Sequence, residues 1–103
     1  MRYSIYIEYS NLIPYKHMAQ VIKRNGSMEA FDKSKISMGL THAGLLVSDA
    51  NNIADQVEQW LPEVLEDDKV DSFVIRDRLV ELLEEMDPQA AQRFLEYKKQ
   101  NPS

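Results

Sequence analysis

The chain has 103 residues, of which 44% are hydrophobic and 28% charged, which is the composition of one small folded domain. It contains no cysteine, and this excludes disulfide bonds, zinc ribbons, iron–sulfur centres and thiol chemistry. The longest uncharged stretch, residues 36–48, is too short to span a bilayer, and no basic segment followed by an apolar run opens the chain. We therefore expect a cytoplasmic protein with no membrane partner.

The charge is unevenly distributed around a net value of −5. Residues 1–47 carry six Lys/Arg and three Asp/Glu, whereas residues 48–88 carry three basic and thirteen acidic groups. Residues 89–103 return to three basic groups and one acidic group. The acidic middle segment would repel a polyanion that covered the whole surface, so we expect no direct binding of nucleic acid. A small anion bound by the basic first half stays compatible with this distribution.

Residues 1–19 predict an N-terminal strand followed by a connector. Residues 2–9 alternate in the way a strand does, with one face made of Tyr3, Ile5, Ile7 and Tyr9. Pro14 then lacks the amide that a strand ladder needs. An exposed edge of this strand would be suited to pairing with another chain.

Residues 20–32 predict a β-hairpin. Residues 21–24 and 29–31 form its strands, and Asn25-Gly26 forms the turn, because this dipeptide tolerates the positive φ angles of a tight hairpin. Asp32 follows, and we expect its carboxylate to cap the next helix by accepting a bond from a backbone amide.

Four helices are expected after the hairpin, from apolar residues that recur at helical spacing. In the first these are Ile36, Leu40 and Ala43; in the second, capped by Ser48, they are Ile53, Val57, Trp60, Leu61 and Val64. In the third, capped by Ser72, they are Ile75, Leu79, Leu82 and Leu83; in the fourth, opened by Asp87-Pro88, they are Ala91, Phe94 and Tyr97. Pro62 predicts a break near residues 59–61.

The predicted fold class is α+β: a small hairpin sheet of two to three strands packed on a four-helix bundle. We expect residues 20–99 to form the domain and residues 100–103 a flexible tail.

The sequence shows no catalytic constellation, so we expect no enzyme. His17 and His42 have no carboxylate or serine at a spacing that indicates a triad or a metal site. The acidic runs 66–68 and 84–85 are typical of solvated charge. The glycines at 26, 39 and 44 match neither the Walker nor the Rossmann pattern.

The hairpin cations are the exception. Lys23 and Arg24 precede the turn and Lys35 enters the following helix, so the fold can bring all three onto one polyphosphate. Glu29 would repel phosphate, and its use would lie elsewhere, for example in accepting a bond from an adenine amino group. The alternative is that the hairpin carries mixed charge only for solubility.

Residues 21–36 resemble the opening of the ATP-cone domain, a module found at the N-terminus of many ribonucleotide reductases and in the bacterial repressor of their genes. The typical opening, Val-x-Lys-Arg-Asp-Gly-x-x-Glu-x-Phe-Asp-x-x-Lys-Ile, coincides with this chain at Lys23, Arg24, Gly26, Glu29, Phe31, Asp32, Lys35 and Ile36. Residues 72–75 look like the family's Ser/Thr-x-x-Ile helix start, and residues 90–98 resemble its closing Ala-Ala-x-x-Tyr-x-x-Tyr-Arg. The resemblance covers residues 20–99.

This resemblance implies a domain that binds ATP or dATP, with or without Mg²⁺, as an allosteric signal and without hydrolysis. It implies that Lys23, Arg24 and Lys35 contact the phosphates, and that the base and sugar lie near Glu29, Asp32, Ile36 and Ser72. Arg76 stands at a position that varies in the family, where a long cation could either add a phosphate contact or block one.

Neither a reductase catalytic domain nor a cysteine zinc ribbon accompanies the resemblance in these residues. We therefore expect a free-standing module that acts as a homo-oligomer or on a separate partner, whether related to ribonucleotide reductase or not. The alternative is a degenerate ATP-cone that serves protein–protein interaction or oligomerisation without nucleotide.

Overall fold

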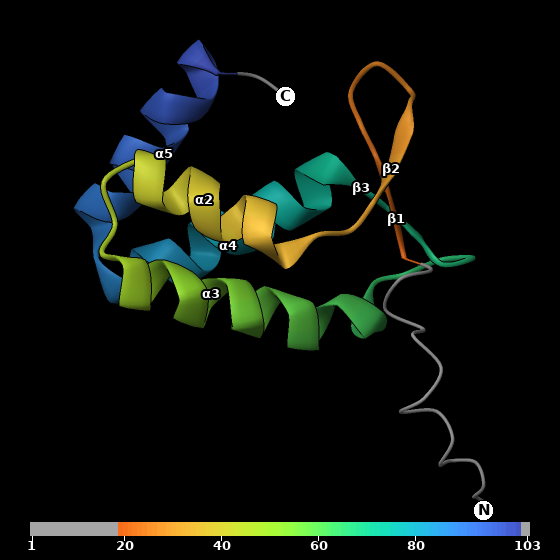
Figure 1. The fold of residues 1–103 in the computed structure, drawn as a ribbon, viewed down its shortest axis with the longest axis horizontal. Helices are drawn as coiled ribbons and strands as arrows, with labels where there is room; N and C mark the ends of the chain where they lie inside the picture. Colours follow the sequence, from red (N-terminus) through yellow and green to blue (C-terminus); the bar gives the residue numbers. More distant parts are fainter. Residues whose placement is uncertain (1–18, 102–103) are drawn as a thin grey trace, which may run out of the picture.

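The computed structural model describes residues 19–101, and the strand expected over residues 2–9 lies outside them. The elements in chain order are β1 (Gln20–Ile22), β2 (Met28–Ala30), α2 (Lys33–His42), α3 (Val47–Trp60), a 3-10 helix (Leu61–Glu63), β3 (Lys69–Asp71), α4 (Ser72–Met86) and α5 (Pro88–Gln100). Figure 1 shows the sheet at one end of the molecule and the four α-helices of the described part packed beside it. The predicted α+β class is confirmed.

The predicted hairpin forms, but its turn is wider than two residues. β1 and β2 are antiparallel with Val21 opposite Glu29, and β1 ends at Ile22. The amide of Gly26 donates to the Lys23 carbonyl at 2.9 Å, and Gly26 has a φ of +88°. The Asn25 side chain accepts a bond from the Ser27 amide at 3.0 Å, so asparagine stabilises the loop through its side chain. The prediction of a two-residue turn is therefore wrong, and Arg24 lies in the loop.

A third strand, β3, was not expected from the sequence. It pairs in parallel with β1, with Val21 opposite Val70, which gives the sheet the order β2-β1-β3. The acidic residues Asp67 and Asp68 precede it as a tight turn with positive φ angles of 53° and 61°. The parallel pairing places the start of α4 directly beyond the hairpin, and this proximity positions the site described below.

Three of the predicted helix boundaries are confirmed. The Asp32 carboxylate accepts a bond from the Ser34 amide at 2.9 Å, and the Asp87 carboxylate accepts one from the Gln89 amide at 3.0 Å. α3 ends at Trp60 and continues as the 3-10 helix that contains Pro62, because proline has no amide to continue the α-helical ladder.

Two predicted caps are wrong. α3 begins at Val47 with Leu46 at the cap position, so Ser48 lies inside the first turn. α4 begins at Ser72 itself, with Asp71 at the cap position. Neither helix has a side-chain cap, because the preceding segments, the loop at Gly44 and strand β3, fix where each helix starts.

The core lies between the helices and against one side of the sheet. Its buried residues include most of the predicted stripe positions: Leu40, Ala43, Ile53, Val57, Leu61, Ile75, Leu79, Leu82, Leu83, Ala91 and Phe94. Ile36, Trp60, Val64 and Tyr97 are partly buried and pack against this cluster. At the surface, Lys33 on α2 contacts two carboxylates of α3, Asp55 at 2.8 Å and Glu58 at 3.2 Å.

Two glycine substitutions should change stability in opposite directions. Gly44 has a φ of +111°, and a Cβ there would lie 3.3 Å from Arg93 Nε. We expect Gly44→Ala to lower the free energy of unfolding by about 1–2 kcal/mol. Gly39 lies inside α2 with open space around a Cβ, so Gly39→Ala should raise it by up to about 1 kcal/mol. Urea unfolding measures both, and shifts of the same sign would contradict this account.

Candidate functional site

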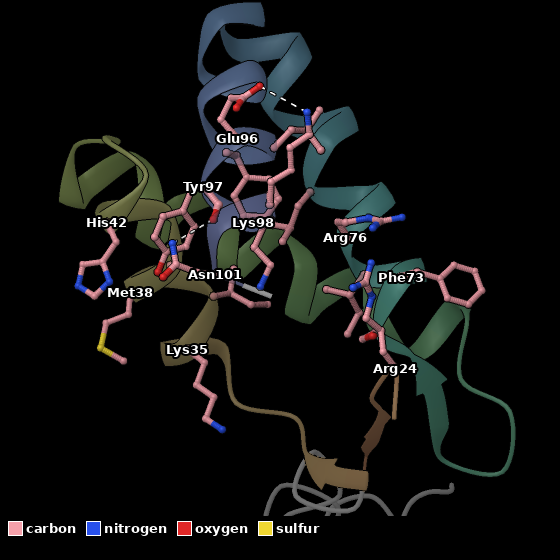
Figure 2. Close-up of a pocket in the computed structure, with 18 of the residues that line it drawn as sticks. Arg24, Lys35, Met38, His42, Phe73, Arg76, Glu96, Tyr97, Lys98 and Asn101 are labelled. Atoms are coloured by element: carbon pink, nitrogen blue, oxygen red, sulfur yellow. Dashed lines mark hydrogen bonds and ion pairs between the residues drawn. The ribbon is translucent and has the colours of Figure 1, made fainter. Parts of the chain in front are cut away.

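A pocket of about 960 Å³ lies where the hairpin loop, α2, α4 and α5 meet. Its lining combines charged side chains with an apolar wall, and Figure 2 shows many of these side chains. The sequence segments that build it are far apart, so the pocket exists only in the folded chain.

Cations from four elements line this pocket. Arg24 comes from the hairpin loop, Lys35 from α2, Arg76 from α4, and Lys98 and Lys99 from α5. In Figure 2 the guanidinium groups of Arg24 and Arg76 lie on one side, and Lys98 extends from α5 toward the middle. The carboxylates of the lining are Glu29 and Glu96, so cations outnumber them. The pocket is therefore suited to an anion.

Lys98 lies close enough to other cations of the site for their charges to affect its pKa. Burial lowers the pKa of its ammonium group, and the positive charges of Lys23, Arg24 and Arg76 lower it further. Burial and like charges thus both disfavour the charged form of this side chain. Such an arrangement is typical of a site that a polyanion neutralises.

Apolar side chains also line the pocket, and we call them its apolar wall. It is formed by Ile36, Met38, Ile75, Leu79, Phe94 and Tyr97. The rings of Tyr97 and His42 lie 6.3 Å apart, and both belong to the lining. A flat, largely apolar group can bury itself against such a wall.

The first turn of α4 also belongs to the pocket, through Ser72, Phe73 and Ile75. The residue at the cap position of this helix, Asp71, makes no side-chain cap hydrogen bond, and the start of a helix carries a partial positive charge. The N-terminus of α2 differs, because the Asp32 carboxylate occupies the Ser34 amide there. The helix N-terminus that can assist an anion is thus that of α4.

The family model of the ATP cone domain matches residues 19–102. This chain belongs to the ATP cone family. ATP cone domains are regulatory modules that bind adenine nucleotides, which agrees with a pocket that combines cations and an apolar wall. A comparison with curated proteins found no match.

Five of the seven residues that the sequence assigned to the nucleotide line the pocket of this ATP cone: Arg24, Glu29, Lys35, Ile36 and Ser72. The other two lie elsewhere. Lys23 is placed beside the Glu29 carboxylate at 3.8 Å. The Asp32 carboxylate accepts bonds from the Ser34 hydroxyl and amide, which lower its pKa.

The sequence reasoning missed Lys98 and left Arg76 open. Arg76 lies four residues after Ser72, so both occupy the same face of α4. Lys98 stands in the closing motif, where the family has arginine, and this was its one sequence signal. A lysine in the last turn of a helix is otherwise typical of solvated charge.

Residues 19–101 contain neither a metal-binding cluster nor a membrane-spanning helix. This part of the chain contains no group of three or more His, Cys, Asp or Glu side chains that could hold a metal ion. None of its helices combines the length and the apolar character needed to cross a membrane.

Proposed function

We propose that this ATP cone binds ATP or dATP in the pocket as a regulatory ligand and releases it unchanged. The observation that supports this most is a single pocket whose lining combines an excess of cations with a set of apolar side chains. Arg24, Lys35, Arg76 and Lys98 contact the phosphates, and Lys23 contributes its charge from beside Glu29. Guanidinium groups suit phosphate because they donate in a planar fork.

The base and sugar occupy the remaining part of the pocket. Ile36 and Tyr97 bury the face of the base, and Glu29 and Ser72 lie near its edge and the ribose. Asp32 acts on the sugar only indirectly, because its carboxylate holds the start of α2 and thereby Lys35. Mg²⁺ enters with the phosphates, since they supply the hard oxygen ligands that it prefers.

The regulatory output is a change in association, either of this chain with itself or with a separate protein in the cytoplasm, related to ribonucleotide reductase or not. A nucleotide shifts such an equilibrium only by the difference in its affinity for the two states. The surfaces that contact the nucleotide come from the hairpin, α2, α4 and α5, so occupancy can alter how these elements are held together.

Isothermal titration with ATP, dATP, GTP and ADP in the presence of magnesium tests the proposal. We expect saturable binding of the adenine nucleotides and no release of inorganic phosphate. Arg24→Ala should weaken ATP binding at least about fivefold, because it removes a charge-assisted contact. Arg93→Ala is the matched control: Arg93 is an exposed arginine of α5 outside the pocket lining, so its loss should leave affinity unchanged.

Absence of binding by all four nucleotides, on protein shown to be folded, would overturn the proposal. The chain would then be better explained as an interaction module that has lost its ligand. Equal loss of affinity in Arg24→Ala and Arg93→Ala would place the nucleotide outside this pocket.

A further inference from the structure

Glu29 occupies an unexpected position among the cations of the site. Its carboxylate oxygen Oε1 accepts a bond from Lys35 Nζ at 3.1 Å, and Oε2 lies 3.8 Å from Lys23 Nζ. One carboxylate on β2 thus contacts two of the three lysine and arginine side chains that the sequence assigned to phosphate. Through Lys23 and Lys35 it also connects the hairpin loop with helix α2.

The Glu29 carboxylate and a phosphate group can bind these two lysines in the same way. Both present anionic oxygens at hydrogen-bond distance, and a lysine ammonium has three donors on one compact charge. A phosphate placed against Lys35 and Lys23 would meet the repulsion of the Glu29 carboxylate. The two anions therefore compete for the same two cations.

We infer that Glu29 is a built-in counter-ion of the phosphate site, which a phosphate group must displace from Lys23 and Lys35 before it binds. This rests on the proposed function and adds to it a residue that sets affinity by opposing the ligand. In consequence, polyphosphate alone binds weakly, since its binding breaks both ion pairs of Glu29 and gives the carboxylate no new partner. A ligand that offers the displaced carboxylate a new hydrogen-bond donor binds more tightly, because the new bond offsets part of the free energy lost with the ion pairs.

The exposure of the two ion pairs, Glu29–Lys23 and Glu29–Lys35, sets how much the loss of Glu29 should change phosphate affinity. The side chains of Lys23, Glu29 and Lys35 are 25%, 37% and 59% exposed, so water screens both contacts. Partly exposed ion pairs contribute little each, and losing two of them should change affinity by about fivefold at low ionic strength. The change should shrink as salt is added, because exposed charges are screened.

Inorganic tripolyphosphate tests the inference, because it carries phosphates and no base. We expect Glu29→Gln to bind tripolyphosphate about fivefold more tightly than the parent protein in isothermal titration at low salt. Glu58→Gln is the matched control. Glu58 contacts Lys33 at 3.2 Å, a length close to that of the Glu29–Lys35 pair, but it lies outside the pocket lining. Glu58→Gln changes the net charge by the same amount as Glu29→Gln and should leave the affinity for tripolyphosphate unaltered.

Parallel titration with ATP separates the two proposals. If the parent protein binds ATP, and Glu29→Gln binds tripolyphosphate no more tightly than Glu58→Gln does, the counter-ion inference is wrong while the proposed function stands. If the parent protein binds no ATP, the proposed function fails. The inference then stands only if Glu29→Gln gains tripolyphosphate binding that Glu58→Gln lacks, and it falls if neither variant binds.

Discussion

Replacement of Lys98 by methionine should weaken ATP binding about tenfold or more, since a charge-assisted contact to phosphate contributes roughly 1.5–3 kcal/mol. The same change should make the fold, measured without nucleotide, more stable. Lys98 is partly buried among Lys23, Arg24 and Arg76, and methionine keeps the length of the side chain while it removes the unfavourable charge. Binding and stability are thus expected to change in opposite directions.

Titration calorimetry and thermal unfolding measure the two effects. We expect the midpoint of unfolding to rise at low ionic strength and to rise less in high salt, because salt screens the repulsion. Lys69→Met is the control, because Lys69 is an exposed lysine of β3 outside the pocket lining. An ATP affinity of Lys98→Met equal to that of the parent would remove Lys98 from the phosphate contacts.

The pH dependence of stability gives an independent check on Lys98. Its pKa is lowered from 10.5 in the folded protein, so the unfolded chain binds more protons between the folded pKa and 10.5. Stability therefore rises with pH across that window, whereas below the folded pKa the penalty is constant and fully present. In Lys98→Met this group no longer titrates, so the free energy of unfolding should rise less with pH across that window than it does in the parent protein. Superimposable pH profiles of the two proteins would contradict the assignment.

Leu40→Ala should lower the free energy of unfolding by about 3 kcal/mol, a large part of the stability of a domain of this size. Leu40 is fully buried in α2, and truncation leaves a cavity in the core between the helices. Leu46→Ala is the matched control, since Leu46 is 71% exposed and should change stability by no more than about 0.5 kcal/mol. Urea unfolding of both variants makes the comparison. Equal losses would mean that Leu40 does not stabilise the core as described.

The sequence predicted those features that depend on neighbouring residues. The helical stripes, the Asp32 and Asp87 caps and the break at Pro62 each follow from contacts within a few residues, and the structure confirms them. The hairpin was also predictable, although its turn is wider than two residues and contains a hydrogen bond from the Ser27 amide to the Asn25 side chain. The serine caps were wrong because a local preference at Ser48 and Ser72 gave way to helix starts imposed by the preceding chain.

Strand β3 was not predictable for a related reason. Three residues are too few to show strand alternation, and β3 is stabilised by pairing with β1, a segment almost fifty residues earlier in the chain. The acidic run before it was typical of solvated charge, and its exposed residues agree with that, yet Asp67 and Asp68 also form the turn that leads into the strand.

The sequence by itself determined the ATP cone class of the chain, its α+β class with the hairpin and four helices, and most of the pocket lining that comes from the hairpin and α2. The tertiary structure alone decided that Arg76 and Lys98 join Arg24, that the first turn of α4 belongs to the pocket, and that Glu29 contacts Lys23 and Lys35. The physical reason is the range of the interactions involved. Caps, turns and helical periodicity depend on residues a few positions apart, whereas the charges of the site meet only when strand pairing and core packing bring distant segments together.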